Sequence, residues 1–198
     1  KYGDIIADRW TDYRILNQKA KSGKTYRQIF SEVADEYSLP PEILFASTAE
    51  EGLRDYINDG PADTKDAKYP VSGFENFGLD NFAEMFPKLV KAGLLPSNFN
   101  YKPATATNEK GDKVSSANFT KVEDAIKAKA AVLSYMNDKV VDFADKNDIA
   151  LSEDALDFFM VAVYNSGLTN AEKMMKDYQG IGVLENDAFL KERPTTGN

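Results

Sequence analysis

The strongest constraint on the fold is a segment near the carboxyl end, residues 152–166, which is apolar on almost every side when written as a helix. Ser152 stands where an N-cap is favoured, and Gly167 follows where helices commonly end. A helix that is apolar all round cannot lie on a surface, so other elements have to cover it. The chain is therefore expected to fold around a helical core.

Helical spacing of apolar residues recurs along most of the remaining chain. Several predicted helix starts carry a capping box, in which a Thr and a Gln or Glu three residues later satisfy backbone N–H groups. These boxes are Thr25/Gln28, Thr120/Glu123 and Thr169/Glu172. The patterns predict helices over residues 4–21, 25–37, 41–56, 82–92, 120–147 and 152–166, and from 169 through 178.

One region departs from the helical pattern. Between Leu94 and Phe119, short strand-like arms flank a Lys110-Gly111-Asp112 turn, which predicts a small surface β-hairpin. The predicted fold class is therefore mainly α, with one hairpin inserted between helices.

The helix predicted from residue 41 is the one that carries candidate chemistry. It opens with Pro40-Pro41, which suits a first helical turn, and it ends in the adjacent acids Glu50 and Glu51. The small residues Ser47-Thr48-Ala49 before them indicate close packing against neighbours. A carboxyl group at the end of a buried helix is a candidate catalytic acid, because desolvation disfavours its charged form. Two solvated acids at a helix end are the alternative interpretation.

The residue types that the chain lacks narrow its chemistry further. It has no histidine and no cysteine, which excludes Ser–His dyads, thiolate nucleophiles and His or Cys metal sites. An enzyme of this composition would transfer protons through a carboxylate, a lysine or a tyrosine. The net charge of −8, without a basic run, argues against a nucleic-acid partner. No apolar run approaches the roughly 18 residues expected of a membrane span.

Three segments follow one another along the chain: the helix ending in Glu50-Glu51-Gly52, the turn GFENFGLDNF at 73–82, and the helix end VAVYNSG at 161–167. Together they resemble the goose-type lysozymes and Slt-like lytic transglycosylases of glycoside hydrolase family 23. The family pattern is a catalytic Glu followed by Ser at the end of an apolar helix, then a Gly-Leu-Met-Gln turn, then Ala-Tyr-Asn-Ala-Gly. The resemblance covers about residues 25–178.

The chain departs from the family pattern at two places. Gly52 stands where the family has Ser, and Asp80-Asn81 stand where it has Met-Gln. With these departures, the chain is similar to divergent lysozyme-like domains in large virion proteins of tailed phages.

The resemblance implies a goose-type, lysozyme-like single domain over residues 25–180, preceded by an N-terminal helical extension at 1–24 and followed by a tail or linker at 181–198. It implies cleavage of the β-1,4 bond between N-acetylmuramic acid and N-acetylglucosamine, with Glu51 as general acid and base. The family's spacing from the helix alanine, taken from Ala46, selects Glu51 over Glu50. No cofactor and no metal are implied.

The same resemblance assigns contacts with the sugar chain to residues of the second and third segments. Tyr164 is expected to hydrogen-bond Glu51 or the substrate, although a core tyrosine with its hydroxyl at the surface is the alternative. Asn165 is expected to contact sugar groups, or else to serve only as a residue of the helix-end turn. The other expected contacts are Gly78, Leu79, Asn81 and Phe77, where Phe77 would stack on a sugar face or lie in the core.

The products remain open between two reactions. A lytic transglycosylase is expected, whereas an inverting muramidase would need a second carboxylate about 6.5–9.5 Å away to activate water. Glu75 is the best-placed candidate for that second acid, with a solvated loop acid as its alternative interpretation. A non-catalytic wall-binding or structural virion module is the third possibility. The expected partner is peptidoglycan, and the chain is expected to be part of a larger virion or secreted protein that acts outside the cytoplasm.

Overall fold

The computed structural model describes residues 16–53, 77–79, 81–107 and 111–181. These residues form seven helices and one two-stranded sheet, so the fold is mainly α, as predicted. Within this part of the chain, no helix combines the length and the apolarity needed to cross a membrane. In chain order the elements are α3 (Tyr26–Tyr37), α4 (Pro41–Thr48), the π-helical turn η1 (Ala49–Leu53), α6 (Phe82–Lys91), β1 (Lys102–Thr107), β2 (Lys113–Asn118), α7 (Val122–Lys146), α8 (Glu153–Ser166) and α9 (Leu168–Ile181).

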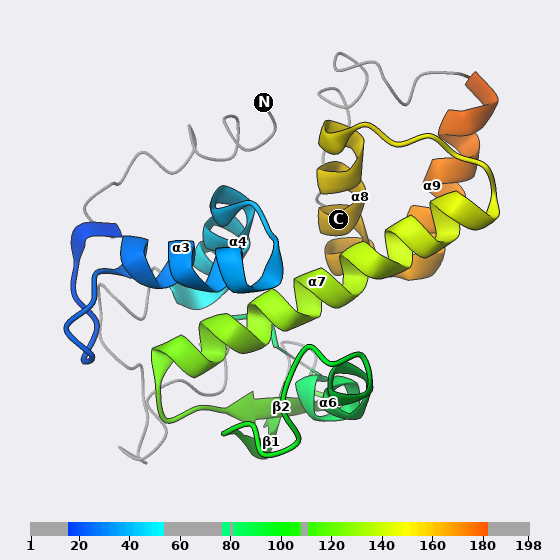
Figure 1. Cartoon of the computed structure of the whole chain (residues 1–198). Helices are drawn as coiled ribbons and strands as arrows, with labels where there is room; N and C mark the ends of the chain where they lie inside the picture. Colours follow the sequence, from blue (N-terminus) through cyan, green and yellow to red (C-terminus); the bar gives the residue numbers. More distant parts are fainter. Residues whose placement is uncertain (1–15, 54–76, 80, 108–110, 182–198) are drawn as a thin grey trace.

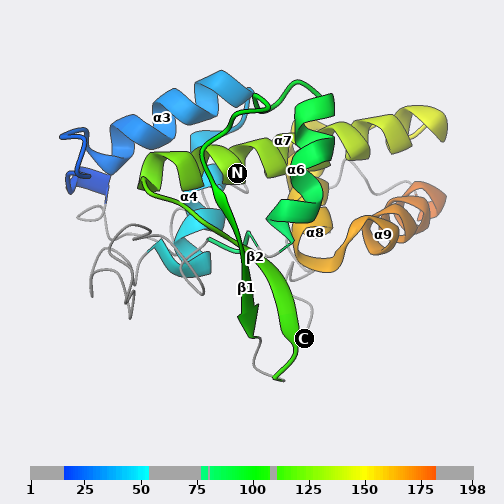
Figure 2. The same cartoon turned by 90° about the horizontal axis from the view of Figure 1, so that it is seen from below.

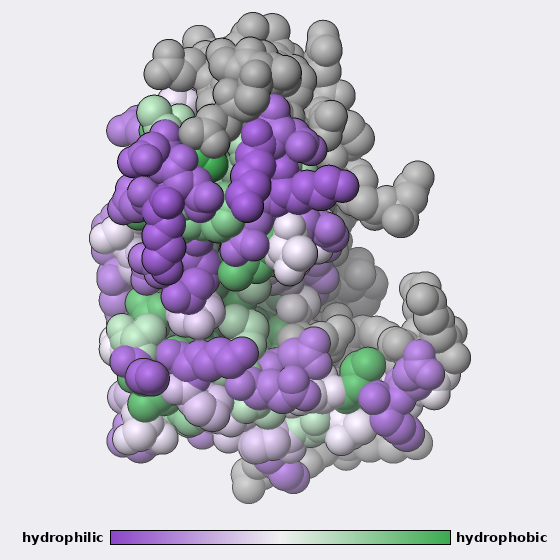
Figure 3. Space-filling view, turned by 90° about the vertical axis from the view of Figure 1, so that its right-hand side faces the viewer, coloured by the Kyte–Doolittle hydropathy of each residue, from purple (hydrophilic) through white to green (hydrophobic). Residues whose placement is uncertain are grey.

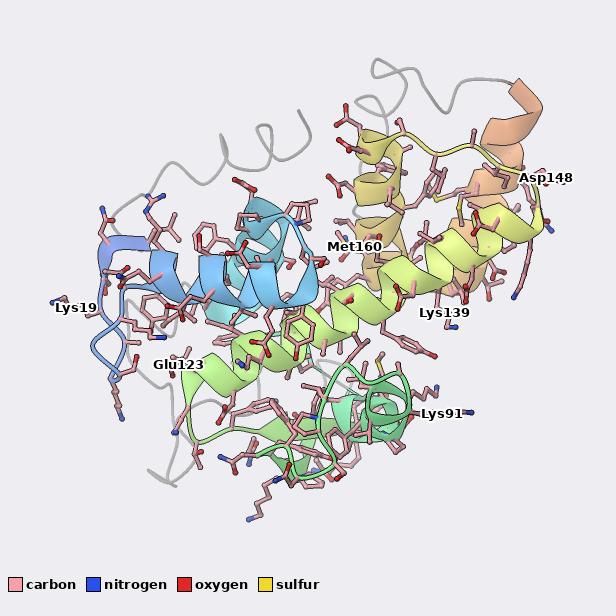
Figure 4. All side chains as sticks on the ribbon, viewed as in Figure 1. Lys19, Lys91, Glu123, Lys139, Asp148 and Met160 are labelled. Atoms are coloured by element: carbon pink, nitrogen blue, oxygen red, sulfur yellow. The ribbon has the colours of Figure 1, made fainter. Side chains whose placement is uncertain are left out.

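Helix α7 is the axis of the molecule. It crosses the whole view in Figure 1, with α3 and α4 along its first half, α6 and the hairpin on the opposite side, and α8 and α9 along its second half. Side chains from these neighbours surround it, as Figure 4 shows. Its buried face is rich in alanine, which lets the surrounding helices approach closely. The buried residues of α7 are Val122, Ala125, Ile126, Ala128, Lys129, Ala130, Ala131, Val132, Leu133, Val140 and Ala144.

Helix α8 lies where its apolar sequence predicted. Its buried residues include Phe158, Phe159 and Met160, which pack between α7 and α9 or against the main core. The Ser152 side chain accepts a hydrogen bond from the Ala155 N–H, which confirms the predicted N-cap. The predicted cap at the other end, Gly167, is also confirmed, with φ of 83°.

The three predicted capping boxes have different outcomes. The Thr25/Gln28 box is present in both directions at the start of α3. The Thr120/Glu123 box is wrong, because α7 begins at Val122 and the Thr120 hydroxyl instead accepts a hydrogen bond from Asn100. The Thr169/Glu172 box is wrong as well, since α9 already begins at Leu168.

The predicted hairpin is confirmed. Strands β1 and β2 pair antiparallel, with Lys102 opposite Asn118 and Thr107 opposite Lys113, and the hairpin extends away from the helices in Figure 2. Residues 108–110 of its connection lie outside the described part of the chain, as do residues 4–15 of the predicted first helix. The backbone N–H of Asn81 donates to the carbonyl of Ser115 on β2, which ties the hairpin to the start of α6.

The surface carries no large apolar face among the described residues. Val141, at 37% exposure, is the one large hydrophobic residue there that counts as exposed. In Figure 3 hydrophilic residues cover much of the visible face, with smaller hydrophobic areas between them. This distribution fits a chain in which 28% of the residues are charged.

Candidate active site

Helix α4 delivers Glu51 to the site. Pro40 occupies the N-cap and Pro41 the first helical position, and the helix then buries Ile43, Leu44, Phe45 and Ala46. The helix was expected to continue to residue 56, but its regular α-helical part ends at Thr48, whose hydroxyl donates to the Leu44 carbonyl at 2.6 Å. The chain then kinks in η1, Ala49–Leu53, where Glu51 and Gly52 leave the helical conformation.

The backbone of this turn has an unusual conformation at the candidate acid. Glu51 has φ of −96° and ψ of 28°, in the sparsely populated bridge region where many active-site residues lie. Gly52 has φ of 110°, a conformation that residues with a Cβ rarely adopt. The local backbone therefore accounts for glycine at this position. The side chain of Glu50 lies outside the described part of the structure.

The second segment brings a tight turn against Glu51. Phe77 and Gly78 have consecutive left-handed conformations, with φ of 59° and 68°. The Tyr164 hydroxyl, from the end of α8, donates to the Gly78 carbonyl at 2.9 Å. A Cβ added at Gly78 would lie 2.0 Å from the Tyr164 hydroxyl, 2.7 Å from the Glu51 Cδ and 2.8 Å from its Oε2. Glycine is therefore required here for two reasons: the conformation and the lack of space.

Glu51, Gly78 and Tyr164 line one cleft, which has a volume of about 390 Å³. Six of the residues predicted to form the site line it, and they come from segments more than 100 positions apart: Glu51, Gly78, Leu79, Asn81, Tyr164 and Asn165. Phe77 does not line it. Its side chain is fully buried in the core, which corrects the expectation that its ring stacks on a sugar. Glu75 lies outside the described residues.

Several lining residues were not predicted as part of the site. They form an apolar wall from α6, α7 and α8, made of Phe82, Met85, Val132, Met136 and Val163, with Gly167 at the helix end. Phe82 also belongs to the main hydrophobic core, and Met85 packs against that core. The others follow the apolar pattern of long helices, and that pattern does not distinguish a cleft wall from a core position.

A buried cation behind the cleft was missed entirely. Lys129, in the middle of α7, is fully buried, and its Nζ donates to the Phe77 carbonyl at 3.0 Å. The same Nζ lies 3.6 Å from the centroid of the Tyr164 ring. One signal in the sequence could have revealed this buried lysine. Lys129 lies inside the alanine-rich run from Ala128 to Ala131, which is expected to be buried and would leave no place for a solvated lysine.

The arrangement is suited to an uncharged polar ligand. Among the described residues that line the cleft, Glu51 is the only ionisable carboxyl group, and Asn81, Tyr164 and Asn165 provide hydrogen-bonding groups beside the apolar wall. A mixed lining of this kind, with few polar groups on an apolar surface, is typical of small-molecule sites. One partly buried carboxyl group next to such a wall can donate a proton to a bound ligand and take one back.

Comparisons with models of known protein families, with curated proteins and with solved structures found no match.

Proposed function

We propose that this chain is a lysozyme-like, peptidoglycan-degrading glycosidase that cleaves the β-1,4 bond between N-acetylmuramic acid and N-acetylglucosamine. One observation carries the proposal: the three segments that resemble the goose-type family meet at one cleft. Glu51, Gly78 and Tyr164 surround a single point there, since one Cβ added at Gly78 would collide with both other side chains. Three short motifs that matched by chance would have no reason to converge in space.

The chemistry follows from one carboxyl group used twice. Glu51, in its acid form, donates a proton to the glycosidic oxygen while the bond from that oxygen to C1 of the muramic acid breaks. The resulting carboxylate then accepts the proton of the sugar's 6-hydroxyl as its oxygen bonds to C1. The product is a 1,6-anhydro sugar, no water is consumed, and Glu51 returns to its acid form. A general acid and base of this kind typically contributes about 10²–10⁴-fold to a rate.

The one acid that a lytic transglycosylase needs is present in the described lining of the cleft. An inverting enzyme needs a second carboxylate on the far side of the sugar, about 6.5–9.5 Å from the first. Glu75, the candidate for that second acid, lies outside the described residues. In the transglycosylase, the sugar's own 6-hydroxyl replaces the activated water, so a single acid suffices.

The test compares Glu51→Gln with Glu42→Gln on purified bacterial sacculi. Glu42 is an exposed acid in the first turn of the same helix and does not line the cleft, so it controls for the loss of a negative charge. Mass spectrometry of the released fragments should find anhydromuropeptides with the native chain and with Glu42→Gln. Release by Glu51→Gln should fall by at least about 100-fold. Undiminished release by that variant would refute the assignment of Glu51.

The same assay separates the other candidates. Products with reducing ends instead of anhydro ends would identify a muramidase, and Glu75 would be the first residue to replace. Binding to sacculi without any soluble product would identify a wall-binding or structural module. Each outcome keeps peptidoglycan as the partner, so we propose that the chain acts on the bacterial wall, as part of a virion or of a secreted protein.

A further inference from the structure

Lys129 is the only fully buried charged residue that the structure describes. It lies on the stretch of α7 between Glu123 and Lys139, both labelled in Figure 4. Taking an ammonium group out of water is strongly unfavourable unless other groups replace its hydration. An apolar residue would fill the same place in the core without that penalty. The contacts of the ammonium group should therefore explain why a lysine occupies this position.

Two contacts of the ammonium group are with the walls of the cleft. Its Nζ donates to the carbonyl of Phe77 and lies over the ring face of Tyr164, 3.0 Å from the oxygen and 3.6 Å from the ring centroid. Tyr164 in turn donates to the next carbonyl, that of Gly78, at 2.9 Å. The carbonyls of Phe77 and Gly78 thus accept hydrogen bonds from Lys129 and Tyr164, whose side chains also contact each other. A cation over a tyrosine ring is favoured most where water is excluded.

The turn they hold is unfavourable by itself. Phe77 is a bulky residue with φ of 59°, and Gly78 follows with φ of 68°. A residue with a Cβ persists in this region only when its surroundings impose the conformation. The α-carbon of Gly78 is packed so closely against Glu51 that no side-chain atom fits between them. A shift of this turn would therefore displace the carboxyl group or open a gap behind it.

We propose that Lys129 is a positioning residue, whose buried ammonium group fixes the Phe77–Gly78 turn and the Tyr164 ring against the carboxyl group of Glu51. The geometric part stands on the contacts alone, whereas its effect on turnover rests on the proposed glycosidase function. Lys129 contacts the walls and not the ligand, so its loss should lower kcat much more than it raises KM.

The experiment replaces Lys129 by Met, which has a similar length but neither charge nor donor. Lys127→Met is the matched control, because Lys127 is two residues away on α7 and forms a partly exposed ion pair with Glu36. We expect Lys129→Met to retain helical circular dichroism and to lower kcat on soluble glycan strands by about 10- to 100-fold, the range that a misplaced catalytic group produces. KM should change by less than about threefold, as expected of an interaction that acts on the transition state. Lys127→Met should leave both constants unchanged.

Two NMR readouts do not depend on turnover. The Gly78 amide signal should shift in Lys129→Met and not in Lys127→Met. In the unmutated chain, the Lys129 methylene protons next to Nζ should resonate upfield of those of Lys127, because the adjoining Nζ lies over the Tyr164 ring, 3.6 Å from its centroid. That second readout needs no variant that might fail to fold.

The outcomes separate the two proposals. If the native chain releases no product, the glycosidase proposal fails, and the NMR signals still decide the role of Lys129. A folded Lys129→Met with native kcat and an unmoved Gly78 signal would overturn the inference. An unshifted Lys129 methylene signal in the native chain would also overturn it. A larger rise in KM than fall in kcat would show that Lys129 acts on binding and would reject the positioning role.

Discussion

Replacing Gly78 by Ala tests the geometry of the cleft most directly. The first effect is on the backbone, because Gly78 has φ of 68°. A residue with a Cβ is disfavoured in this region by about 1–2 kcal/mol. This contribution is independent of the neighbours and would arise at any glycine with a similar conformation.

The second effect comes from the neighbours. The new Cβ would lie 2.0 Å from the Tyr164 hydroxyl, whereas ordinary contact begins at 3.4 Å, so the hydroxyl must retreat by about 1.4 Å. That retreat breaks its hydrogen bond to the Gly78 carbonyl, which is worth about 1 kcal/mol net. The two effects together lower the free energy of unfolding by about 2–3 kcal/mol. For a chain of this length, the melting temperature would fall by about 4–12 °C.

The assay is urea denaturation followed by circular dichroism, together with release of glycan fragments from sacculi. Gly93→Ala is the matched control, because Gly93 has φ of 74° and an added Cβ would meet nothing within 4 Å. The control should lose only the backbone contribution, about 1–2 kcal/mol, and keep native turnover. Gly78→Ala should lose about 1 kcal/mol more and, because the Glu51 carboxyl group is pushed aside, about 100-fold in turnover.

Equal destabilisation by the two variants, with native turnover in Gly78→Ala, would refute the close approach of Glu51, Gly78 and Tyr164. A loss of turnover in both variants would show that the activity responds to general destabilisation and not to this contact.

Two further predictions concern positions outside that contact. Gly52→Ser, which introduces the residue usual in the goose-type family, should lower the free energy of unfolding by about 1–2 kcal/mol because φ is 110° there, and a variant as stable as the native chain in urea would contradict this reasoning. Burial, followed by the charge of Asp154, raises the pKa of Asp157 to about 6 from its ordinary value of 3.8. The folded state therefore binds this proton more tightly than the unfolded state, and stability is lost as pH rises from about 4 to about 6. Asp157→Asn should remove that loss and stabilise the chain by roughly 1 kcal/mol at pH 7 but not at pH 3, after allowance for partial solvent exposure; thermal melts at both pH values measure the difference.

Much of the fold could be predicted because its signals are local. The apolar pattern of 152–166 predicted α8, and the Thr25/Gln28 pair predicted the start of α3. Two capping boxes failed because α7 begins at Val122 and α9 begins at Leu168. The Thr120 hydroxyl accepts a hydrogen bond from Asn100, 20 positions away. A capping box seen in a sequence does not show which other groups its members meet.

The candidate site also contains residues that the sequence could indicate and residues that only the packing could place. The motifs indicated Glu51, Gly78 and Tyr164, because glycine, tyrosine and a helix-end acid are recognisable residue types in a recognisable order. The role of Phe77 was misjudged, because an aromatic residue in a turn can face the solvent or the core, and only the packing decides.

The sequence by itself determined the helical class, the hairpin, the absence of histidine and thiol chemistry, and the order of the three motifs, all of which depend on residue types and short spacings. The tertiary structure alone decided that the regular helix after Pro41 ends at Thr48 and that Gly52 has a positive φ. It alone decided that Lys129 reaches the Phe77 carbonyl 52 residues away. The physical reason is that these features depend on the path of the folded backbone and on contacts between segments far apart in the sequence, which no local pattern encodes.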